Sequence, residues 1–554
     1  MEEILSKKKG KKIILLGNEA IVRGALEAGV QFVSTYPGTP ASEIGNTFYN
    51  LKSQISKSKN SFYFEYSVNE KVALETAMGA SFSGLKTLVA MKHFGLNVCQ
   101  DALLPFVYAG SLGPTVIVVA DDPSCHSSAQ SEQNSRIISY LAHIPTLEPA
   151  DPQECKDFTK LAFEISKKFK IPVLVRITTR VAHQRAPVVL GELRSLKPFQ
   201  GKFKKDPRKF ITMPPRVLEM KEELWKKIEK IKELSEKNKI NIVEGRKLRV
   251  GNRSLGIIVS GVSYLYVMEA QKELGISLPA LKLGFFYPLP EEKIKKFLKK
   301  LRKVLVIEEL EPLLEEAITR MAKEVNPNLK IYGQDLLSPI GELDPDKVLS
   351  ALVKFTDRKL NFRQPVFKIQ LPKRFPQPCP GCPYWLAFAA IKKGIEESGL
   401  KKEEVVFGGD IGCYMLAGSP IIDLQDYLFC MGSSIGIAHG VKKALRSDSK
   451  RKLIALIGDS TFFHAGIPAL INAVFNQSNP LIIIMDNQIT AMTGQQPNPG
   501  QTVKIEEVVS ACGVKNLKVI SPLDQKAMIK TIKEFLKKKE VSVIISRYPC
   551  KFIR

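Results

Sequence analysis

Between residues 12 and 180, short apolar runs alternate with amphipathic stretches. The runs KKIILLGN, FVSTYPGTP, TLVAMKH, PTVIVVADD and IPVLVRITTR contain strand-length apolar segments, and stretches such as NEAIVRGALEAGVQ have the apolar spacing of a helix. Strands that alternate with helices in this way are typical of a parallel, doubly wound sheet. Such sheets bind their ligands beyond the carboxyl ends of the strands. The polar loops that follow these runs are therefore where we expect function.

Two later segments repeat the pattern. A second α/β unit is predicted to start at SLGIIVSG, include KVLVIEEL and end near Lys354, and a third contains VVFGGD, LIALIGD, PLIIIMDN and VSVIISRYP. Residues 191–250 are rich in Pro, Lys and Glu and indicate a charged connection with one exposed helix. A Pro-rich bridge, RQPVFKIQLPKRFPQP, precedes the third unit. We therefore expect an α/β protein of three doubly wound parallel-sheet domains at residues 1–190, 251–360 and 375–554.

Composition narrows the class of protein. The 554 residues are 44% hydrophobic and 25% charged, which is ordinary for a globular protein and excludes a disordered, collagen-like or disulfide-scaffold chain. The net charge of +26 is spread along the chain, without a zinc-finger, RNA-recognition or basic-zipper signature, so we expect no nucleic-acid partner. A positive surface suits an acidic redox carrier better. Lys and Glu enrichment also fits a hyperthermophile surface.

The hydrophobic pattern also bears on location. No run approaches the roughly 18 uninterrupted apolar residues that a membrane span needs. The apolar segment near the N-terminus, Ile13 to Leu16, is too short for a signal peptide. We therefore expect a soluble, cytoplasmic protein without a membrane partner.

The most informative segment begins at the end of one predicted strand and reaches the end of the next. Gly458, Asp459 and Ser460 end a strand and open a helix, and Asn487 follows 28 residues after Asp459 at the end of the next strand. A carboxylate and an amide oxygen at one sheet edge suit a hard divalent cation that bridges a diphosphate. The helix start would direct its N–H groups at the same phosphates. Alone, Gly-Asp-Ser is also compatible with a simple strand-to-helix turn.

This arrangement resembles the thiamine diphosphate motif, with Ser460 in place of the usual second glycine. The resemblance implies a Mg²⁺ ion held by Asp459, Asn487 and the backbone carbonyl of Ile489. It also implies that Thr493 belongs to the cofactor-binding residues of the same segment.

Thiamine enzymes also place a carboxylate against N1′ of the cofactor's aminopyrimidine, an acid–base role for a buried Glu. Glu70, which follows a predicted strand and opens a small-residue helix, is the candidate, and Glu75 is its rival one turn later. The alternative is that Glu70 only complements the helix dipole.

Further segments in the same order resemble one family over residues 13–550. They are YPGTPAS, SVNEKVALE, MKHFGLNV, DDPSCHSSAQSEQNSR, CPGCP, GDIGCYML, MGSSIGIAHG and GDSTFFHAGI. The family is the large (alpha) subunit of indolepyruvate:ferredoxin oxidoreductase, a thiamine-diphosphate-dependent 2-oxoacid oxidoreductase. The resemblance implies a pyrimidine-binding thiamine domain at 1–190, a transketolase-C-terminal-like domain at 251–360 and a diphosphate-binding thiamine domain at 375–554.

The resemblance also implies a reaction. An aryl-2-oxoacid is oxidatively decarboxylated to acyl-CoA and CO₂, and the electrons pass to ferredoxin. The implied partners are the small (beta) subunit, in an α2β2 assembly, together with ferredoxin, CoA and the 2-oxoacid. Thr39 would bind the substrate's oxo or carboxylate oxygens, His93 and His126 would donate to the carboxylate, and His464 would lie over the thiazolium. For each histidine, a structural role is the alternative.

Two departures from the family and one cysteine set bear on electron transfer. The chain has Tyr384 where the family usually has His, and it has no C-x2-C-x2-C-x3-C-P run of the two-cluster ferredoxin domain. Related 2-oxoacid oxidoreductases spread four cluster-binding cysteines in the same way as four of the nine here: Cys379, Cys382, Cys413 and Cys550. We expect one [4Fe–4S] cluster on them. A structural Zn²⁺ and four unconnected thiols are the alternatives.

Two other functions stay open. A non-oxidative thiamine-dependent decarboxylase that releases aldehyde would need Glu70 and Asp459 but not the four cysteines. A non-catalytic assembly subunit would need neither, and the combination of Glu70 with the Gly-Asp-Ser and Asn487 set speaks against it.

Overall fold

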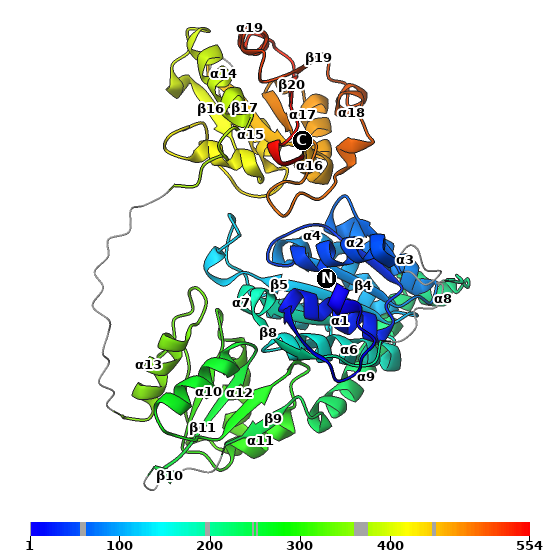
Figure 1. The fold of residues 1–554 in the computed structure, drawn as a ribbon, viewed down its shortest axis with the longest axis vertical. Helices are drawn as coiled ribbons and strands as arrows, with labels where there is room; N and C mark the ends of the chain where they lie inside the picture. The colour runs from blue at the N-terminus through cyan, green and yellow to red at the C-terminus, as the bar shows by residue number, and fades with distance from the viewer. Residues whose placement is uncertain are drawn as a thin grey trace. The chain divides into compact units, whose positions relative to one another are not determined.

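The chain folds into two compact units, Met1–Gln364 and Pro365–Arg554, which we describe separately. The computed structural model in Figure 1 describes residues 2–55, 62–193, 200–245, 249–250, 253–358, 375–445 and 450–553. Most of the predicted Pro-rich bridge lies outside the described residues, as do parts of the predicted charged connection.

Unit 1 is built around a seven-stranded sheet in the order β13-β6-β7-β5-β4-β2-β3. All pairings except that of β13 with β6 are parallel. Every residue of β5 and β7 is buried, as expected for a parallel sheet whose two faces are both covered. The strands are β2 (Phe32–Thr35), β3 (Tyr63–Tyr66), β4 (Thr87–Lys92), β5 (Thr115–Asp121), β6 (Thr146–Leu147), β7 (Val173–Thr178) and β13 (Phe285–Tyr287).

The helices of this region follow the predicted alternation. Helix α1 packs against α6, and α3 packs against α4. The helices are α1 (Gly17–Ala28), α2 (Ser42–Ile55), α3 (Glu70–Phe82), α4 (His93–Ala109), α5 (Arg136–Ala142), α6 (Pro152–Phe169), α7 (Thr179–His183), α8 (Pro207–Phe210) and α9 (Arg216–Lys237).

The first predicted strand forms, but outside the parallel sheet. β1 (Lys12–Leu16) pairs antiparallel with β8 (Arg185–Val189) in a separate two-stranded sheet. Its side chains alternate between buried and exposed, and Ile14 is 68% exposed. That alternation is typical of a half-covered antiparallel pair rather than of a strand buried on both faces.

The charged helix predicted as exposed is exposed on one face only. α9 carries Lys and Glu along one side, while Met220, Leu224, Ile228 and Ile231 on the other side are buried and α9 contacts α4. An amphipathic helix gains its stability from such packing rather than from propensity alone. Among the described residues, no helix combines the length and the apolar character that a membrane crossing requires.

The second sheet of unit 1 has the order β15-β14-β11-β12-β9, with β10 beside β11. β11, β12, β14 and β15 are parallel, and β9 is an antiparallel edge strand. The strands are β9 (Ile242–Glu244), β10 (Arg249–Val250), β11 (Arg253–Ser260), β12 (Ala280–Leu283), β14 (Lys303–Ile307) and β15 (Lys330–Tyr332). The helices are α10 (Ser263–Glu273), α11 (Glu291–Leu298), α12 (Leu313–Val325) and α13 (Pro345–Phe355).

The two sheets of unit 1 share structure. β13 follows β12 in the chain, yet it pairs with β6 of the seven-stranded sheet. One hydrophobic cluster contains buried residues of both sheets. The first two predicted domains are therefore joined by a shared core and by β13, which follows a strand of the second sheet in the chain but belongs to the first sheet.

Unit 2 has a five-stranded, all-parallel sheet in the order β16-β17-β18-β20-β19. Alternate residues of β17 face two different hydrophobic clusters: Ile454 and Leu456 pack with α14 and α19, while Ala455 and Ile457 pack with α15, α17 and α18. The strands are β16 (Val405–Gly408), β17 (Lys452–Gly458), β18 (Leu481–Asp486), β19 (Asn516–Ile520) and β20 (Ser542–Arg547). The helices are α14 (Tyr384–Glu396), α15 (Ser433–Ala444), α16 (Asp459–Thr461), α17 (Ile467–Phe475), α18 (Ile505–Ala511) and α19 (Gln525–Phe535).

Candidate active site

In unit 2, the predicted diphosphate residues lie at the ends of two neighbouring strands. β17 and β18 are parallel and Gly458 is in register with Met485, so Asp459 and Asn487 directly follow adjacent strand ends. Both side chains are buried. Gly458 lies against the ring of Tyr414, where an added Cβ would come within 2.5 Å of a ring carbon. The spacing therefore brings the carboxylate and the amide to one edge, as the sequence predicts.

Asp459 is a buried carboxylate without a cationic partner among the described residues. It accepts a hydrogen bond from Asn498 Nδ2 at 2.9 Å and others from the backbone N–H groups of Ser460 and Gln488. Burial and the nearby carboxylate of Asp486 raise its pKa to about 7. Arg547 donates to the neighbouring Asp486 at 2.6 Å rather than to Asp459. A divalent cation beside Asp459 would offset this excess of negative charge.

The loop after β18 folds back toward the helix start. Thr490 Oγ1 donates to Ser460 Oγ at 3.0 Å, and the backbone of Thr490 pairs with that of Gln496. Thr493 Oγ1 donates to Gln496 Oε1 at 2.7 Å. Asn487 Oδ1 accepts the N–H of Ile489 at 3.2 Å, and because an amide oxygen has two lone pairs it retains capacity for a second partner.

His464 lies in the next turn of the same helix. A single π-helical turn, Phe462–Gly466, separates α16 from α17 and contains His464, whose side chain is buried. Such turns interrupt regular helices at functional positions more often than elsewhere.

Tyr384 lies between the diphosphate edge and the predicted cysteine ligands. Its hydroxyl donates to the carbonyl of Met485 at 3.1 Å, one residue before the end of β18. Burial, together with the negative charges of Asp459, Cys413 and Cys382, raises the pKa of this tyrosine well above its usual value. The residue at which the sequence departs from the family pattern is therefore a neutral, buried neighbour of both groups.

The four predicted cysteines lie near one another. Burial, together with the nearby thiolates of Cys382, Cys550 and Cys379, raises the pKa of Cys413 to about 12. The N–H of Cys550 donates to the carbonyl of Asn487 at 3.1 Å, which links this group to the diphosphate edge. Within the described residues, however, no three His, Cys, Asp or Glu side chains are close enough to hold a metal ion. The thiols share a region without forming a ligand set.

In unit 1, the predicted catalytic glutamate is buried at a strand end. Glu70 opens α3, after Asn69, whose Oδ1 accepts the N–H of Val72 at 2.8 Å. The side chain of Glu70 lies over Gly95 of α4, where an added Cβ would come within 2.4 Å of its Cγ. Glu75, the rival, is exposed and lies 3.8 Å from Lys71 Nζ. Of the two glutamates, only Glu70 faces the protein interior.

Thr39 lies in the loop after β2 and contacts the loop after β5. Its Oγ1 is 3.4 Å from Ser42 Oγ, and its carbonyl accepts a hydrogen bond from Ser127 Oγ at 3.3 Å. The YPGTP and DDPSCHSS segments, which the sequence analysis singled out separately, are therefore in direct contact.

The two histidines predicted to bind the substrate are placed very differently. His93 is fully buried, its Nδ1 lies 3.4 Å from the carbonyl of Ala120, and burial lowers its pKa. Its Nε2 has no hydrogen-bond partner among the described residues. His126 is half exposed, and its Nε2 lies 3.1 Å from a carboxylate oxygen of Glu342. His126 is therefore turned toward the second sheet of unit 1.

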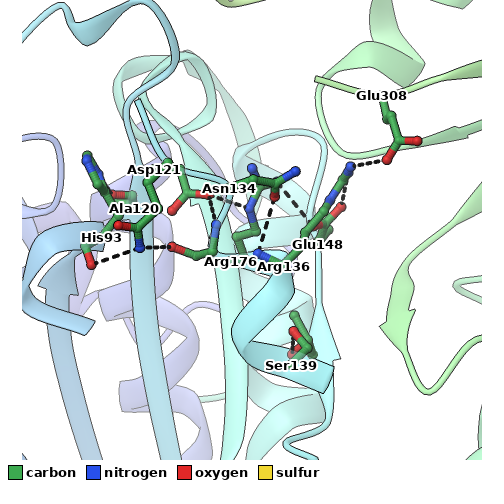
Figure 2. Close-up of polar contacts among 12 residues, drawn as sticks. His93, Ala120, Asp121, Asn134, Arg136, Ser139, Glu148, Arg176 and Glu308 are labelled. Carbon is green, nitrogen blue, oxygen red and sulfur yellow. Dashed lines mark hydrogen bonds and ion pairs between the residues drawn. The ribbon is translucent and has the colours of Figure 1, made fainter. Parts of the chain in front are cut away.

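A buried ionic network adjoins His93 (Figure 2). Arg176 donates to Asp121 at 2.7 Å and to Glu148 at 3.1 Å, and Arg136 donates to Glu148 and, at 3.0 Å, to Glu308. Burial opposes the ionisation of Glu148, but the two guanidinium groups hold its pKa at about 2. The network joins the end of β5 to the start of α12, where the N–H groups of residues 314 and 315 donate to Glu308.

Sequence reasoning did not identify Lys92, the last residue of β4. Its Nζ donates to Ser128 Oγ at 2.9 Å and to the carbonyl of Ser127 at 3.2 Å. Burial lowers its pKa to about 8. The sequence feature that could have identified Lys92 is its position at the end of an apolar strand, directly before the predicted helix of the MKHFGLNV motif.

Comparison with known proteins identifies related families. A family model described as "Pyruvate flavodoxin/ferredoxin oxidoreductase, thiamine diP-bdg" matches residues 23–239. One described as "Thiamine pyrophosphate enzyme, C-terminal TPP binding domain" matches residues 410–546. Relatives that are similar over nearly the whole of this chain carry the name indolepyruvate oxidoreductase subunit IorA. That of Pyrococcus horikoshii is 43% identical, covering 100% of this chain and 87% of the relative, and that of Methanothermobacter marburgensis is 41% identical, covering 99% and 88%.

A solved structure shares the fold. It is the 2-oxoglutarate:ferredoxin oxidoreductase of Magnetococcus marinus, with a TM-score of 0.50 and 18% identity over 62% of this chain and 65% of that one. Together with the sheets described above, this similarity confirms the predicted doubly wound α/β fold class.

Proposed function

The chain belongs to the indolepyruvate oxidoreductase subunit IorA family, and from this we propose its substrate and electron acceptor. It is a thiamine-diphosphate-dependent 2-oxoacid oxidoreductase. We propose that it oxidatively decarboxylates aryl-2-oxoacids of the indolepyruvate type to acyl-CoA and CO₂, with ferredoxin as electron acceptor. The observation that carries the proposal is the buried edge of Asp459 and Asn487, where a carboxylate lacks a cation.

The residues of unit 2 fit a metal-bound diphosphate. Asp459, Asn487 and the carbonyl of Ile489 would hold Mg²⁺, whose charge would offset that of Asp459. Gly458, Ser460 and Thr493 would border the diphosphate. When bound, thiamine diphosphate supplies the electron sink that decarboxylation requires.

In unit 1, Glu70 would share a proton with N1′ of the aminopyrimidine, a task that suits its burial. Thr39 and His93 would orient the substrate oxygens, and His464 of unit 2 would lie over the thiazolium. His126 is the weaker candidate of the predicted donors because Glu342 already accepts its hydrogen bond or ion pair.

We propose further that Cys379, Cys382, Cys413 and Cys550 hold one [4Fe–4S] cluster as the first electron acceptor. Their mutual proximity and the hydrogen bond from Cys550 to Asn487 support a cluster close to the cofactor. The remaining partners in this proposal are a small (beta) subunit in an α2β2 complex, ferredoxin and CoA, in the cytoplasm. The net charge of +26 favours an acidic acceptor.

The first test is catalytic. The complex purified without oxygen should reduce ferredoxin or a viologen dye when given an aryl-2-oxoacid, CoA, thiamine diphosphate and Mg²⁺. Glu70→Gln should lower the rate at least about 100-fold, because the ring nitrogen loses its acid–base partner. Glu75→Gln is the matched control and should leave the rate unchanged. The opposite pattern would assign the role to Glu75, and two fully active variants would contradict the role of either.

The second test addresses the cluster. Iron and acid-labile sulfide should be present at about four atoms each per chain. Cys550→Ser should bleach the cluster absorption, whereas Cys512→Ser, in the same unit but outside the set, should not. Zinc alone, or no metal, would contradict the cluster.

One observation favours a second function. Because the described cysteines do not form a metal-ligand set, a non-oxidative decarboxylase that releases aldehyde remains the alternative. Aldehyde formation that needs neither CoA nor an electron acceptor would support that alternative over the oxidoreductase.

A further inference from the structure

We propose that Lys92 binds the carboxylate of the 2-oxoacid substrate. This inference rests on the proposed function, since it assigns the residue that recognises the acid group of that substrate. Lys92 ends β4 and directly precedes His93. β2 separates β4 from β3, the strand that precedes Glu70 in the chain.

Lys92 lies where three loops of the sheet edge meet. Its stem packs on Gly38 of the YPGTP loop, where an added Cβ would come within 3.0 Å of Lys92 Cγ. Its ammonium reaches the loop after β5, where Ser127 and Ser128 accept its hydrogen bonds. Ser127 in turn donates to the carbonyl of Thr39. The lysine therefore connects the predicted substrate loop to the edge that holds Glu70.

The charge of Lys92 is available to a ligand. The neighbouring cations Arg136 and Arg176 are neutralised by buried carboxylates, whereas no carboxylate in the described part of the chain forms an ion pair with Lys92. An ammonium has three N–H donors, and two of them are used by neutral oxygens. The third donor and the net charge suit a carboxylate oxygen.

The groups that face the ammonium are identifiable. Asp122, Glu70 and Cys125 favour its charged form, and burial opposes it more strongly. Asp122 is already committed, because Ser127, Ser128 and Thr179 all donate to its carboxylate. His93, next in the chain, is held neutral by burial. The balance lowers the pKa of Lys92 to about 8, so an incoming carboxylate would stabilise the charged amine.

This assignment predicts a substrate-selective defect. Decarboxylation breaks the bond to the carboxyl carbon, the electron pair stays on the substrate, and neutral CO₂ leaves. The corresponding aldehyde carries no carboxylate, and it joins the reaction after the point at which CO₂ has left the 2-oxoacid. Lys92→Met should therefore lower kcat/KM for the 2-oxoacid roughly 50-fold, mainly through KM, and change that for the aldehyde less than about threefold.

The experiment measures both substrates in the complete complex, with dye reduction as the readout. Lys71→Met is the matched control: it removes an equal charge next to Glu70, but Lys71 is surface-exposed and paired with Asp101. It should leave both activities unchanged. Lys92→Arg should restore at least a third of the 2-oxoacid activity, because the cation is restored.

The pH profile is a second, independent readout. As pH rises through about 8, Lys92 loses its proton, so wild-type kcat/KM for the 2-oxoacid should fall tenfold per unit above that pH. In Lys92→Arg the fall should be absent up to pH 10, since a guanidinium stays charged. With the aldehyde as substrate, kcat/KM should not show this fall above pH 8 in any variant.

The outcomes separate this inference from the proposed function. If wild type is inactive with aryl-2-oxoacids, the proposed function fails. If wild type is active and Lys92→Met loses both substrates equally, or neither, only the role of Lys92 fails. Equal loss with a lowered melting temperature would mean a structural role and would likewise overturn the assignment.

Discussion

The carboxyl edge of the seven-stranded sheet of unit 1 and that of the five-stranded sheet of unit 2 differ in how their charges are balanced. In unit 1, Arg136 and Arg176 are surrounded by carboxylates within the protein, at distances of 2.6 to 3.1 Å. In unit 2, Arg547 pairs with Asp486, and Asp459 has no cation among the described residues. At the first edge the two cations are neutralised by buried carboxylates of the protein, whereas at the second a buried carboxylate has no cation among the described residues.

This difference indicates what each edge is built to do. The ion pairs of Arg136 and Arg176 fix the loops of unit 1 in place. Lys92, at the border of this network, forms no such ion pair with a described carboxylate and can bind a charged ligand. In the proposed function, the excess negative charge of the unit 2 edge would attract a divalent cation, which would in turn bind a diphosphate. The pKa of Glu148, which contacts both arginines, is held at about 2, whereas burial raises the pKa of Glu308, which contacts Arg136 alone, to about 7. Burial and Asp486 raise the pKa of Asp459 to about 7 as well.

The largest effect tests the neutralised edge. Arg136→Met should lower the free energy of unfolding of unit 1 by about 3 to 5 kcal/mol, because it leaves the buried carboxylate of Glu308 without a cation and that of Glu148 with Arg176 alone. Urea unfolding in a Trp385→Phe background isolates the signal, since Trp225 is then the remaining tryptophan.

Arg216→Met is the control for this change. Arg216 also pairs with two glutamates, but on the surface of α9, so its loss should cost less than about 1 kcal/mol. Equal effects of the two variants would contradict the view that the network of unit 1 is tightly coupled.

The next effect tests the edge of unit 2. Asp459→Asn should weaken Mg²⁺-dependent binding of thiamine diphosphate about 100-fold, measured by titration calorimetry, because the cation loses its carboxylate ligand. Asp524→Asn, a helix-cap change in the same unit, should leave the affinity unchanged. Unaltered binding by Asp459→Asn would show that the cation is held elsewhere.

A smaller effect tests the fit of Glu70. Gly95→Ala introduces a Cβ 2.4 Å from Glu70 Cγ, which forces the glutamate to shift and should lower kcat about tenfold. Gly79→Ala on α3 is the control: no atom lies within 4 Å of its added Cβ. It should keep full activity and gain up to about 1 kcal/mol of stability. Full activity of Gly95→Ala would argue against a fixed position for Glu70.

The smallest effect concerns Tyr384. Tyr384→Phe removes the hydrogen bond to the carbonyl of Met485 and should lower the free energy of unfolding of unit 2 by about 1 kcal/mol. In a Trp225→Phe background, the fluorescence of Trp385 reports this transition. The iron content should not change, because the tyrosine is a spacer rather than a ligand. Loss of iron would contradict that role.

The sequence predicts best what depends on neighbours along the chain. Asp459 and Asn487 follow consecutive strands, and consecutive strands of a parallel sheet usually lie side by side, so their meeting is predictable. Glu70 is also recognisable from its neighbours in the chain, because it opens a helix directly after a predicted strand. The predicted strand at Ile13 also forms, but its partner β8 lies far along the chain and local pattern does not identify it.

Residues defined by distant partners escape this reasoning. His126 faces Glu342 rather than the strand ends, because the loop after β5 is docked on the second sheet of unit 1. Lys92 is one of 82 Lys and Arg residues, and its chemistry arises from burial that the sequence does not reveal. The mutual approach of Cys382, Cys413 and Cys550 likewise depends on loops from three separate parts of unit 2.

The pairing of β13 with the seven-stranded sheet has a consequence for recombination between genes. If recombination replaced residues 253–358 with those of another protein, β6 would lose the strand that completes its ladder and would expose unpaired N–H and C=O groups. An unpaired edge invites aggregation, so such a chimera would be removed by selection. The two sheets of unit 1 are therefore expected to pass between genes as one block, whereas the sheet of unit 2, built from its own five strands, is free to be transferred alone.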